Sequence, residues 1–259
     1  MSHVSTEVAE GVATLWLDRP DRHNAFDDGL IRELDDAIDI LGKDRAVRVV
    51  MLAGKGKSFS AGADLGWMRR MADASEVDNE KGAADLAEMM YRLRSLAKPT
   101  VALVQGAALG GGVGLIAACD MAVAAADAVF ALSEVRLGLI PSVISPYVIA
   151  AIGPRAAQRY FLTAERFDAV TAERLGLVHA VVPAEQLWAE GRRLAALLVQ
   201  NAPTAMAEAK RLIADVASRP IDAALRAETA RRIARLRAGA EAREGVSAFL
   251  EKRKPRWPD

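Results

Sequence analysis

The feature of this sequence that most constrains its fold occurs twice: an apolar run of strand length ends in glycines, and a helical pattern begins directly after them. The first case is VRVVMLAGKGKSFSAGADL, residues 47–65, and the second is PTVALVQGAALGGGVGL, residues 99–115. Continuous apolar runs of this length are typical of strands that are buried on both faces of a parallel sheet. Two such strand–turn–helix units predict an α/β fold.

The two ends of the chain differ from this middle part. Residues 4–19 read as a β-hairpin around the turn AEG, residues 9–11. After residue 183 only helical patterns remain, punctuated by Pro203 and Pro220. We therefore predict a core over residues 1–183 that carries the functional site, followed by a helical region over residues 184–259.

Composition excludes several classes of function. The 34 basic and 34 acidic residues leave no net charge for unspecific binding of nucleic acid or of an anionic membrane. No apolar run reaches the roughly 18 residues of a membrane span. The single cysteine, Cys119, cannot form an intramolecular disulfide, and the three histidines lack the spacing of metal ligands. We predict a cytoplasmic protein with no metal and with no nucleic-acid or membrane partner.

The glycine turns themselves predict a kind of chemistry. A glycine lets the backbone approach a ligand closely, and the first N–H groups of a helix have no partner within the helix. Two such helix starts that converge on one point form an oxyanion hole, in which two N–H donors face an oxygen that gains negative charge. The phosphate-binding spacings GxGxxG and GxxxxGK[ST] are absent, so a nucleotide site is not predicted.

Successive segments of the chain resemble the enoyl-CoA hydratase/isomerase family, the crotonase superfamily. They are SAGADLGWM (60–68), KPTVALVQGAALGGG (98–112), CDMAVAAADAVF (119–130) and SEVRLGLIP (133–141), in the family's order and with similar spacing. More narrowly, GLIAACDMA (114–122) and LSEVRLGLIPSVISPYV (132–148) resemble the bacterial branch that hydrates 3-methylglutaconyl-CoA and isohexenylglutaconyl-CoA. The resemblance implies a crotonase-like spiral of ββα turns with a C-terminal helical appendage.

The resemblance also implies roles for individual residues. The backbone N–H groups of Ala63 and Gly111 would hold the thioester oxygen of an acyl-CoA, and Trp67 would line the acyl pocket or pack in the core. The remaining residues expected beside the CoA ester are Ser60, Ala61, Gly62, Asp64, Leu65 and Gly110. Coenzyme A is part of the substrate, so no separate cofactor is expected. The apolar helices after residue 183 are expected at the contacts of a homotrimer, or of a hexamer of two trimers.

One acidic residue of the family pattern is missing. Two-carboxylate hydratases of this family place one glutamate in the helix after the glycines and a second glutamate one strand later. The first position is Gly114 in this chain, and the second is Glu134. The resemblance therefore implies that Glu134 alone carries the acid–base chemistry, and an apolar surrounding would raise its pKa. After Pro141, SVISPYV replaces the glycine-rich loop of many relatives, which implies a different acyl pocket.

Arg136 follows Glu134 by two residues and would share its face of a regular strand. It could bind a carboxylate of the substrate through two parallel hydrogen bonds, or it could form a structural ion pair.

Three functions remain open from the sequence. The first is hydration of a branched and carboxylated enoyl-CoA, and the second is isomerisation of an enoyl-CoA with Glu134 as the single proton carrier. The third is a non-catalytic role, as a scaffold or an RNA-binding member of the family.

Overall fold

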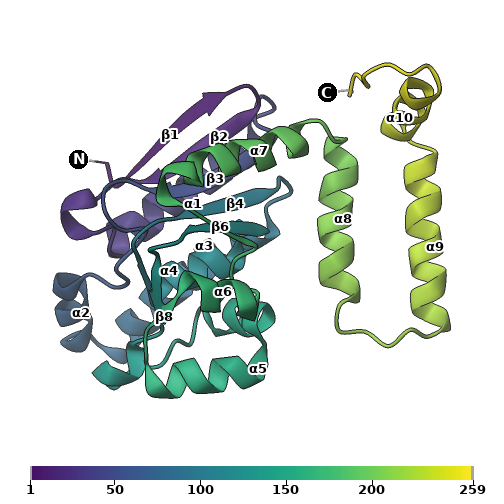
Figure 1. Ribbon diagram of the computed structural model, residues 1–259. Coiled ribbons are helices and arrows are strands. Elements are labelled where there is room, and N and C mark those ends of the chain that lie inside the picture. The colour runs from purple at the N-terminus through teal and green to yellow at the C-terminus, as the bar shows by residue number, and fades with distance from the viewer. Residues whose placement is uncertain (1, 258–259) are drawn as a thin grey trace.

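A computed structural model describes residues 2–257 of the chain (Figure 1). Its centre is a six-stranded sheet with the order β1-β2-β3-β4-β6-β9. The strands are β1 (Val4–Ala9), β2 (Val12–Leu17), β3 (Val49–Gly54), β4 (Thr100–Val104), β6 (Met121–Ala125) and β9 (Ala180–Val182). The hairpin of β1 and β2 is antiparallel and every other pair in this sheet is parallel, which confirms the α/β prediction.

A smaller sheet lies beside the large one. It consists of β5 (Ala107–Leu109), β7 (Val129–Ala131) and β8 (Phe167–Asp168), in the order β5-β7-β8. The chain enters this sheet directly after β4 and again after β6, so consecutive ββα units alternate between the two sheets. This arrangement is the predicted crotonase-like spiral.

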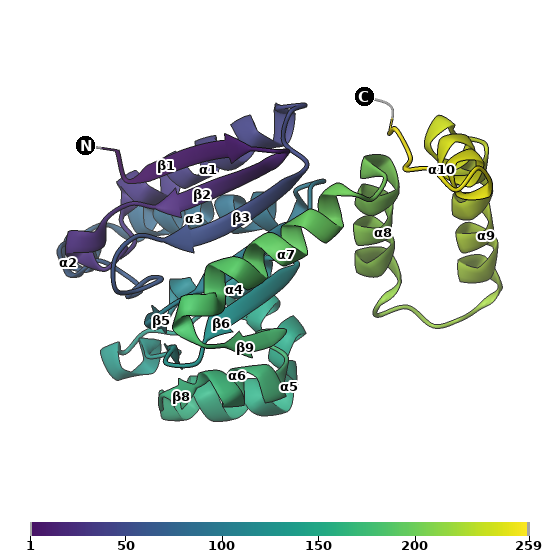
Figure 2. The same ribbon diagram turned by 45° about the horizontal axis from the view of Figure 1, so that its top comes forward.

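Helices cover both faces of the large sheet (Figure 2). The main apolar core joins α1 (Asp28–Lys43) and α3 (Glu76–Ser95) to one face, together with α4 (Gly111–Ala118) and α5 (Ser145–Thr163). A second apolar cluster joins α7 (Leu187–Val199) to the other face, where the backbone of Gly191 lies against Leu103. The short helices α2 (Leu65–Ala72) and α6 (Ala169–Leu175) complete this body.

The last three helices stand apart from the body (Figure 1). They are α8 (Pro203–Val216), α9 (Ala223–Arg237) and α10 (Ala240–Leu250). An ion pair of 2.7 Å between Lys210 of α8 and Asp120 ties them to the core. The boundary at residue 184 stays a prediction, because α7 belongs to the predicted helical region and yet packs on the sheet. Residues 258–259 of that region lie outside the described residues.

The structure corrects the expected surroundings of Glu134. The strand β7 ends at Ala131, and Glu134 begins a turn of 3₁₀-helix that we call η2 (Glu134–Leu137). Gly138 ends η2 in the left-handed conformation, with φ of 72°. The chain therefore leaves the sheet before Glu134, and Glu134 and Arg136 do not share a strand face.

Candidate functional site

The two glycine turns lie side by side. The N–H of Ser60 donates to Ala107 O at 3.0 Å, and the N–H of Leu109 donates to Ser60 O at 2.9 Å. The backbone carbonyl of Leu109 also approaches Gly62, where any side chain would be 3.1 Å from it. Gly62 has a φ of 85°, which favours glycine for a second reason. The turns that precede α2 and α4 are therefore neighbours in the fold, and the convergence of their donors on one point stays a prediction.

Both turns offer unpaired backbone donors. The N–H groups of Gly62 and Asp64, on either side of Ala63, are hydrogen-bonded, whereas the N–H of Ala63 has no acceptor within residues 2–257. Gly111 is the first residue of α4, so its N–H has no partner inside the helix, and it donates no hydrogen bond elsewhere in the described chain. This start is two residues earlier than the sequence pattern indicated, because Gly110 takes positive φ (49°) and the helix begins directly after it.

The side chain of Glu134 brings a carboxyl group to this point. Its Oε1 lies 3.0 Å from the position that a Cβ on Gly110 would occupy, so the carboxylate lies against the start of α4. Its Oε2 is buried and has no hydrogen-bond partner among residues 2–257. Gly110 therefore makes room for the carboxylate as well as for the left-handed turn.

Burial raises the pKa of the Glu134 carboxyl, and a backbone hydrogen bond opposes this increase only in part. A carboxylate with a free oxygen and a raised pKa is better suited to accept and return a proton than an exposed carboxylate is. This direction of the pKa agrees with the expectation from the sequence.

Gly114, where the family pattern has the first glutamate, is one helical turn from Gly110. The position is filled from outside: a Cβ at residue 114 would overlap Ile144 Cγ2 and would lie 2.7 Å from Ile144 Cβ and 3.2 Å from Met90 Cε. Ile144 and Met90 are both buried. Ile144 belongs to SVISPYV, the segment in which this chain departs from the family pattern.

The segment from Ser60 to Asp64 is held in place through its backbone. Ser60 Oγ donates to Asn24 O at 2.9 Å, and the N–H of Ala61 donates to His23 O at 2.9 Å. Phe26 lies across the two turns, because its backbone pairs with Ala63 and its ring lies 3.3 Å from where a Cβ on Gly111 would be. The sequence analysis did not identify Phe26, since nothing in its spacing distinguishes it from a core residue.

Asp64 has a structural task at this site. Its Oδ1 accepts from the N–H groups of Gly66 and Trp67 at 2.8 and 3.0 Å and so caps α2. These two backbone hydrogen bonds keep the pKa of Asp64 below its ordinary value, and the bond from Trp67 has the larger effect. Leu65 is exposed at the start of the same helix.

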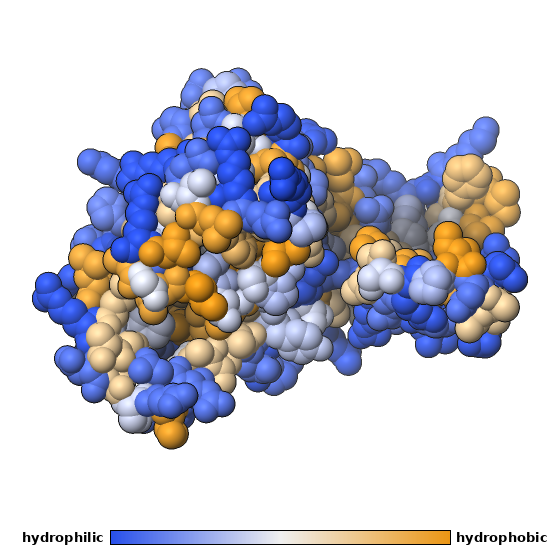
Figure 3. All heavy atoms as spheres, turned by 90° about the horizontal axis from the view of Figure 1, so that it is seen from below, coloured by the Kyte–Doolittle hydropathy of each residue, from blue (hydrophilic) through white to orange (hydrophobic). Residues whose placement is uncertain are grey.

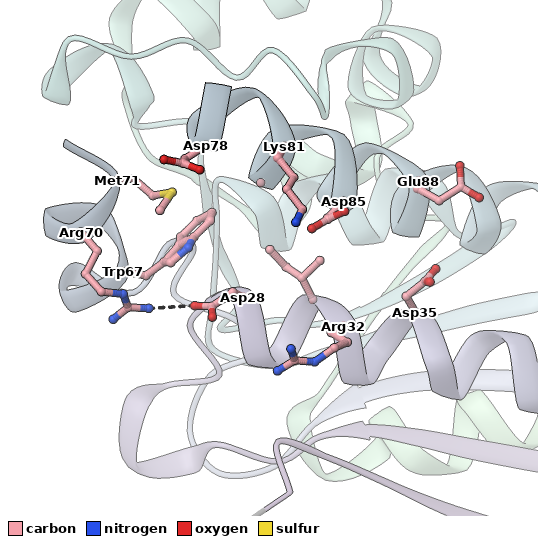
Figure 4. Close-up of a pocket in the computed structure, with 12 residues that line it drawn as sticks. Asp28, Arg32, Asp35, Trp67, Arg70, Met71, Asp78, Lys81, Asp85 and Glu88 are labelled. Carbon is pink, nitrogen blue, oxygen red and sulfur yellow. Dashed lines mark hydrogen bonds and ion pairs between the residues drawn. The ribbon is translucent and has the colours of Figure 1, made fainter. Parts of the chain in front are cut away.

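A cavity of about 420 Å³ lies between α1, α2 and α3 (Figure 4). Trp67 points into it, whereas Glu134 is not part of its wall. The wall is rich in charge, and its residues are Asp28, Ile31, Arg32, Asp35, Trp67, Arg70, Met71, Asp78, Lys81, Gly82, Asp85 and Glu88. Trp67 also packs against the main core, which is one of the two roles expected for it, whereas the lining of an acyl pocket stays a prediction.

Arg136 takes a different position from the one expected. It is exposed on η2, and two residues of 3₁₀-helix separate side-chain directions by about 120°. Its guanidinium has no carboxylate partner in the described part of the chain. The structural ion pair considered from the sequence is therefore absent there, and binding of a substrate carboxylate stays a prediction.

Other reactive side chains are engaged elsewhere. Cys119 is buried, and burial raises the pKa of its thiol to about 12. His23 contacts Ser58, and His179 Nδ1 accepts from the N–H of Ala122. Within residues 2–257 no group of three or more histidine, cysteine or acidic side chains could hold a metal ion. No helix in the same range has both the length and the apolar character to cross a bilayer.

Comparison with known proteins gives this geometry its context. Residues 7–259 match the family model described as enoyl-CoA hydratase/isomerase. The crotonyl-CoA hydratase of Syntrophomonas wolfei is 34% identical over 255 residues (97% of this chain and 96% of the relative), and the 2,3-dehydroadipyl-CoA hydratase of Escherichia coli is 31% identical over 257 residues (98% of each). The crystal structure of an enoyl-CoA hydratase from Shewanella pealeana superposes with a TM-score of 0.96 at 45% identity and covers 98% of this chain and 96% of that one. The chain thus belongs to the enoyl-CoA hydratase/isomerase family.

Proposed function

We propose that this protein hydrates an α,β-unsaturated acyl-CoA with Glu134 as its only acid–base group. The observation that carries the proposal is the position of a buried, unpartnered carboxylate oxygen beside two turns with unpaired N–H groups. The family match supports the thioester chemistry.

The proposed reaction uses each of these groups once. The N–H groups of Ala63 and Gly111 donate to the thioester oxygen, which gains negative charge as water adds to the β-carbon. Glu134 accepts a proton from the water while the new C–O bond forms. The same carboxyl then returns a proton to the α-carbon, the enolate collapses to the thioester, and Glu134 is again ionised.

We further propose that the acyl group is branched and carries a carboxylate. Two observations support this class. The narrower sequence resemblance is to hydratases of glutaconyl-type thioesters, and one 31% identical relative bears a name that specifies a dicarboxylic acyl group. Arg136 has no carboxylate partner in residues 2–257 and would supply the counter-charge.

Isomerisation is the second candidate, and one observation favours it. The apolar contact of Ile144 and Met90 with Gly114 leaves no room for a second carboxylate on α4. Moving a double bond needs one base that carries a proton between two carbons, whereas hydration must also hold a water molecule. A single glutamate is therefore sufficient for isomerisation.

A direct assay separates these functions. The protein is incubated with crotonyl-, 3-methylglutaconyl-, isohexenylglutaconyl- and 3-enoyl-CoA, and the conjugated chromophore is followed together with the product mass. Loss of the chromophore with a gain of 18 mass units, fastest for a carboxylated thioester, supports the proposal. Formation of a conjugated chromophore from 3-enoyl-CoA at constant mass favours the isomerase. No turnover of any thioester would contradict both and favour a non-catalytic role.

The assembly of the protein is a separate proposal. Large apolar side chains are exposed on the C-terminal helices, including Phe249 and Leu250 at 82% and 73%, and Figure 3 shows hydrophobic residues on that part of the surface. Apolar surface of this kind marks a site of association. We propose a homotrimer, with a pair of trimers as the larger alternative, and expect sedimentation equilibrium to give three or six times the chain mass. A monomer at micromolar concentration would contradict it.

A further inference from the structure

The segment that carries the proposed catalytic glutamate is attached to α4 at both ends. At its first residue, Glu134 lies against Gly110, and at its last residue, Ile144 lies on Gly114. Gly110 directly precedes α4 and Gly114 lies in its first turn, where the N–H of Gly114 donates to Gly110 O at 3.2 Å. The two contacts therefore lie about one helical turn apart at the start of α4.

The middle of this segment has little other support. Leu137, Leu139 and Ile140 are 58%, 54% and 71% exposed, so their side chains do not anchor the chain to the core. The hydrogen bonds of this stretch are local, such as the one from the N–H of Leu139 to Glu134 O at 3.1 Å. Nearer the far end, Pro141 is buried and Val143 packs against the main core, and η2 contacts α5. The position of Glu134 consequently depends on the contact at Gly110 and on the packing of residues 141–144 at the start of α5.

The contact at Gly114 requires glycine. Ile144 is only 3% exposed and lies so near the helix backbone that an added Cβ would meet both its Cβ and its Cγ2. Ile144 also precedes α5 directly, and its carbonyl accepts from the N–H of Val148 at 3.1 Å, which fixes the start of α5. Any side chain at residue 114 must displace Ile144 and the chain that leads to it.

We propose that Ile144 is a positioning residue for Glu134: seated on Gly114, it fixes the far end of the segment that holds the carboxylate against Gly110. The glycine at position 114 therefore does more than remove a glutamate, because only a residue without a side chain lets Ile144 pack against the backbone of α4. This inference rests on the proposed role of Glu134 as the acid–base group.

A set of variants tests the contact. Gly114→Ala adds one methyl group where Ile144 stands, and Ile144→Ala removes the side chain that fills the seat. A displacement of about 1 Å can cost about 10²-fold in rate, so we expect kcat to fall about 10- to 100-fold in each, with KM for the thioester within about threefold. The loss caused by Gly114→Ala should be smaller in an Ile144→Ala background, because the contact with Cγ2 is then gone. Ile144→Val, which retains most of the contact, should keep nearly all activity.

Ile152→Ala is the matched control. Ile152 is also buried on α5 and loses the same atoms, but it does not lie on Gly114. It should lower Tm to a similar extent and leave the kcat and its pH dependence unchanged. If Gly114→Ala and Ile144→Ala lower Tm but leave kcat unchanged, as expected for Ile152→Ala, the positioning role is refuted. If Gly114→Ala does not fold, the kcat of Ile144→Ala alone is the test.

A spectroscopic measurement keeps this inference separate from the proposed activity. The carboxyl band of Glu134 in the infrared spectrum, identified by its absence in Glu134→Gln, is titrated in each variant. A displaced carboxylate gains water, so its titration should move to lower pH in Gly114→Ala and Ile144→Ala but not in Ile152→Ala. An unchanged titration overturns the inference even if the wild type is an active hydratase. A shifted titration in a protein that converts no thioester would support the inference and refute the proposed function.

Discussion

Glu134 should make the protein less stable as pH rises, and Glu134→Gln should remove this effect. Below the ordinary carboxyl pKa, both the folded and the unfolded chain carry the proton on Glu134. As pH rises, the unfolded chain loses this proton first, because burial raises the pKa only in the folded state. The folded state then binds more protons than the unfolded state, so the free energy of unfolding falls until pH passes the folded pKa.

The magnitude follows from the state of the side chain. A buried polar oxygen without a partner costs about 1–3 kcal/mol, and Oε2 of Glu134 is such an oxygen. Because the side chain is only partly buried and a glutamine keeps one polar group there, we expect the lower part of this range, about 1 kcal/mol. For a chain of this size that corresponds to an increase in Tm of about 2–4 °C in Glu134→Gln above the folded pKa.

Scanning calorimetry between pH 4 and pH 8 measures this difference. The Tm of Glu134→Gln should be close to that of the wild type at pH 4 and higher at pH 8. Glu80→Gln removes an exposed carboxylate and serves as the control for the loss of one negative charge. If Glu134→Gln is as stable as the wild type at pH 8, or less stable, then burial of the ionised Glu134 carboxylate does not lower the stability of the folded protein.

Three further predictions concern the turns around Glu134. Gly111→Pro removes the backbone N–H at the first position of α4, where proline is tolerated, and should lower kcat about 10²–10³-fold. Gly111→Ala keeps this donor and should keep most of the activity. Equal activities of the two folded variants would exclude the N–H of Gly111 as a donor to the thioester. Asp64→Ala removes the N-terminal cap of α2 and should lower the free energy of unfolding by about 1 kcal/mol in a denaturant titration. A denaturant midpoint equal to that of the wild type would contradict this. Arg136→Gln should raise KM for 3-methylglutaconyl-CoA and leave KM for crotonyl-CoA unchanged, and an equal effect on both would argue against a carboxylate contact.

The sequence predicts the local units of this fold better than their environment. The β1–β2 hairpin and the two strand–glycine–helix units are visible because turn residues and apolar runs act over short distances. The 3₁₀ turn at Glu134 is not visible, since SEVRLG has the length and composition of a strand end. The contact of Glu134 with Gly110 is equally hidden in the sequence, because it joins residues that are far apart along the chain.

The candidate site shows the same division. The glycines next to two helix starts predict unpaired backbone donors there, and the family resemblance implies that these donors are Ala63 and Gly111, a role that stays a prediction. The sequence does not reveal that Ile144 fills the space at Gly114, since only the folded chain brings the start of α5 onto α4. The resemblance places Asp64 beside the CoA ester, which stays a prediction, whereas the cap that its carboxylate forms on α2 is seen only in the structure.

The central claim is that Glu134 alone moves the proton, and the kcat of Glu134→Gln tests it most directly. Glutamine keeps the size and polarity of the side chain but cannot accept a proton. We predict that kcat on the best enoyl-CoA falls by about 10⁴-fold, at the upper end of what a general acid–base group contributes, while the affinity for the saturated analogue butyryl-CoA stays within about threefold. A folded Glu134→Gln protein that retains near-normal kcat would contradict the account and require another group to carry the proton.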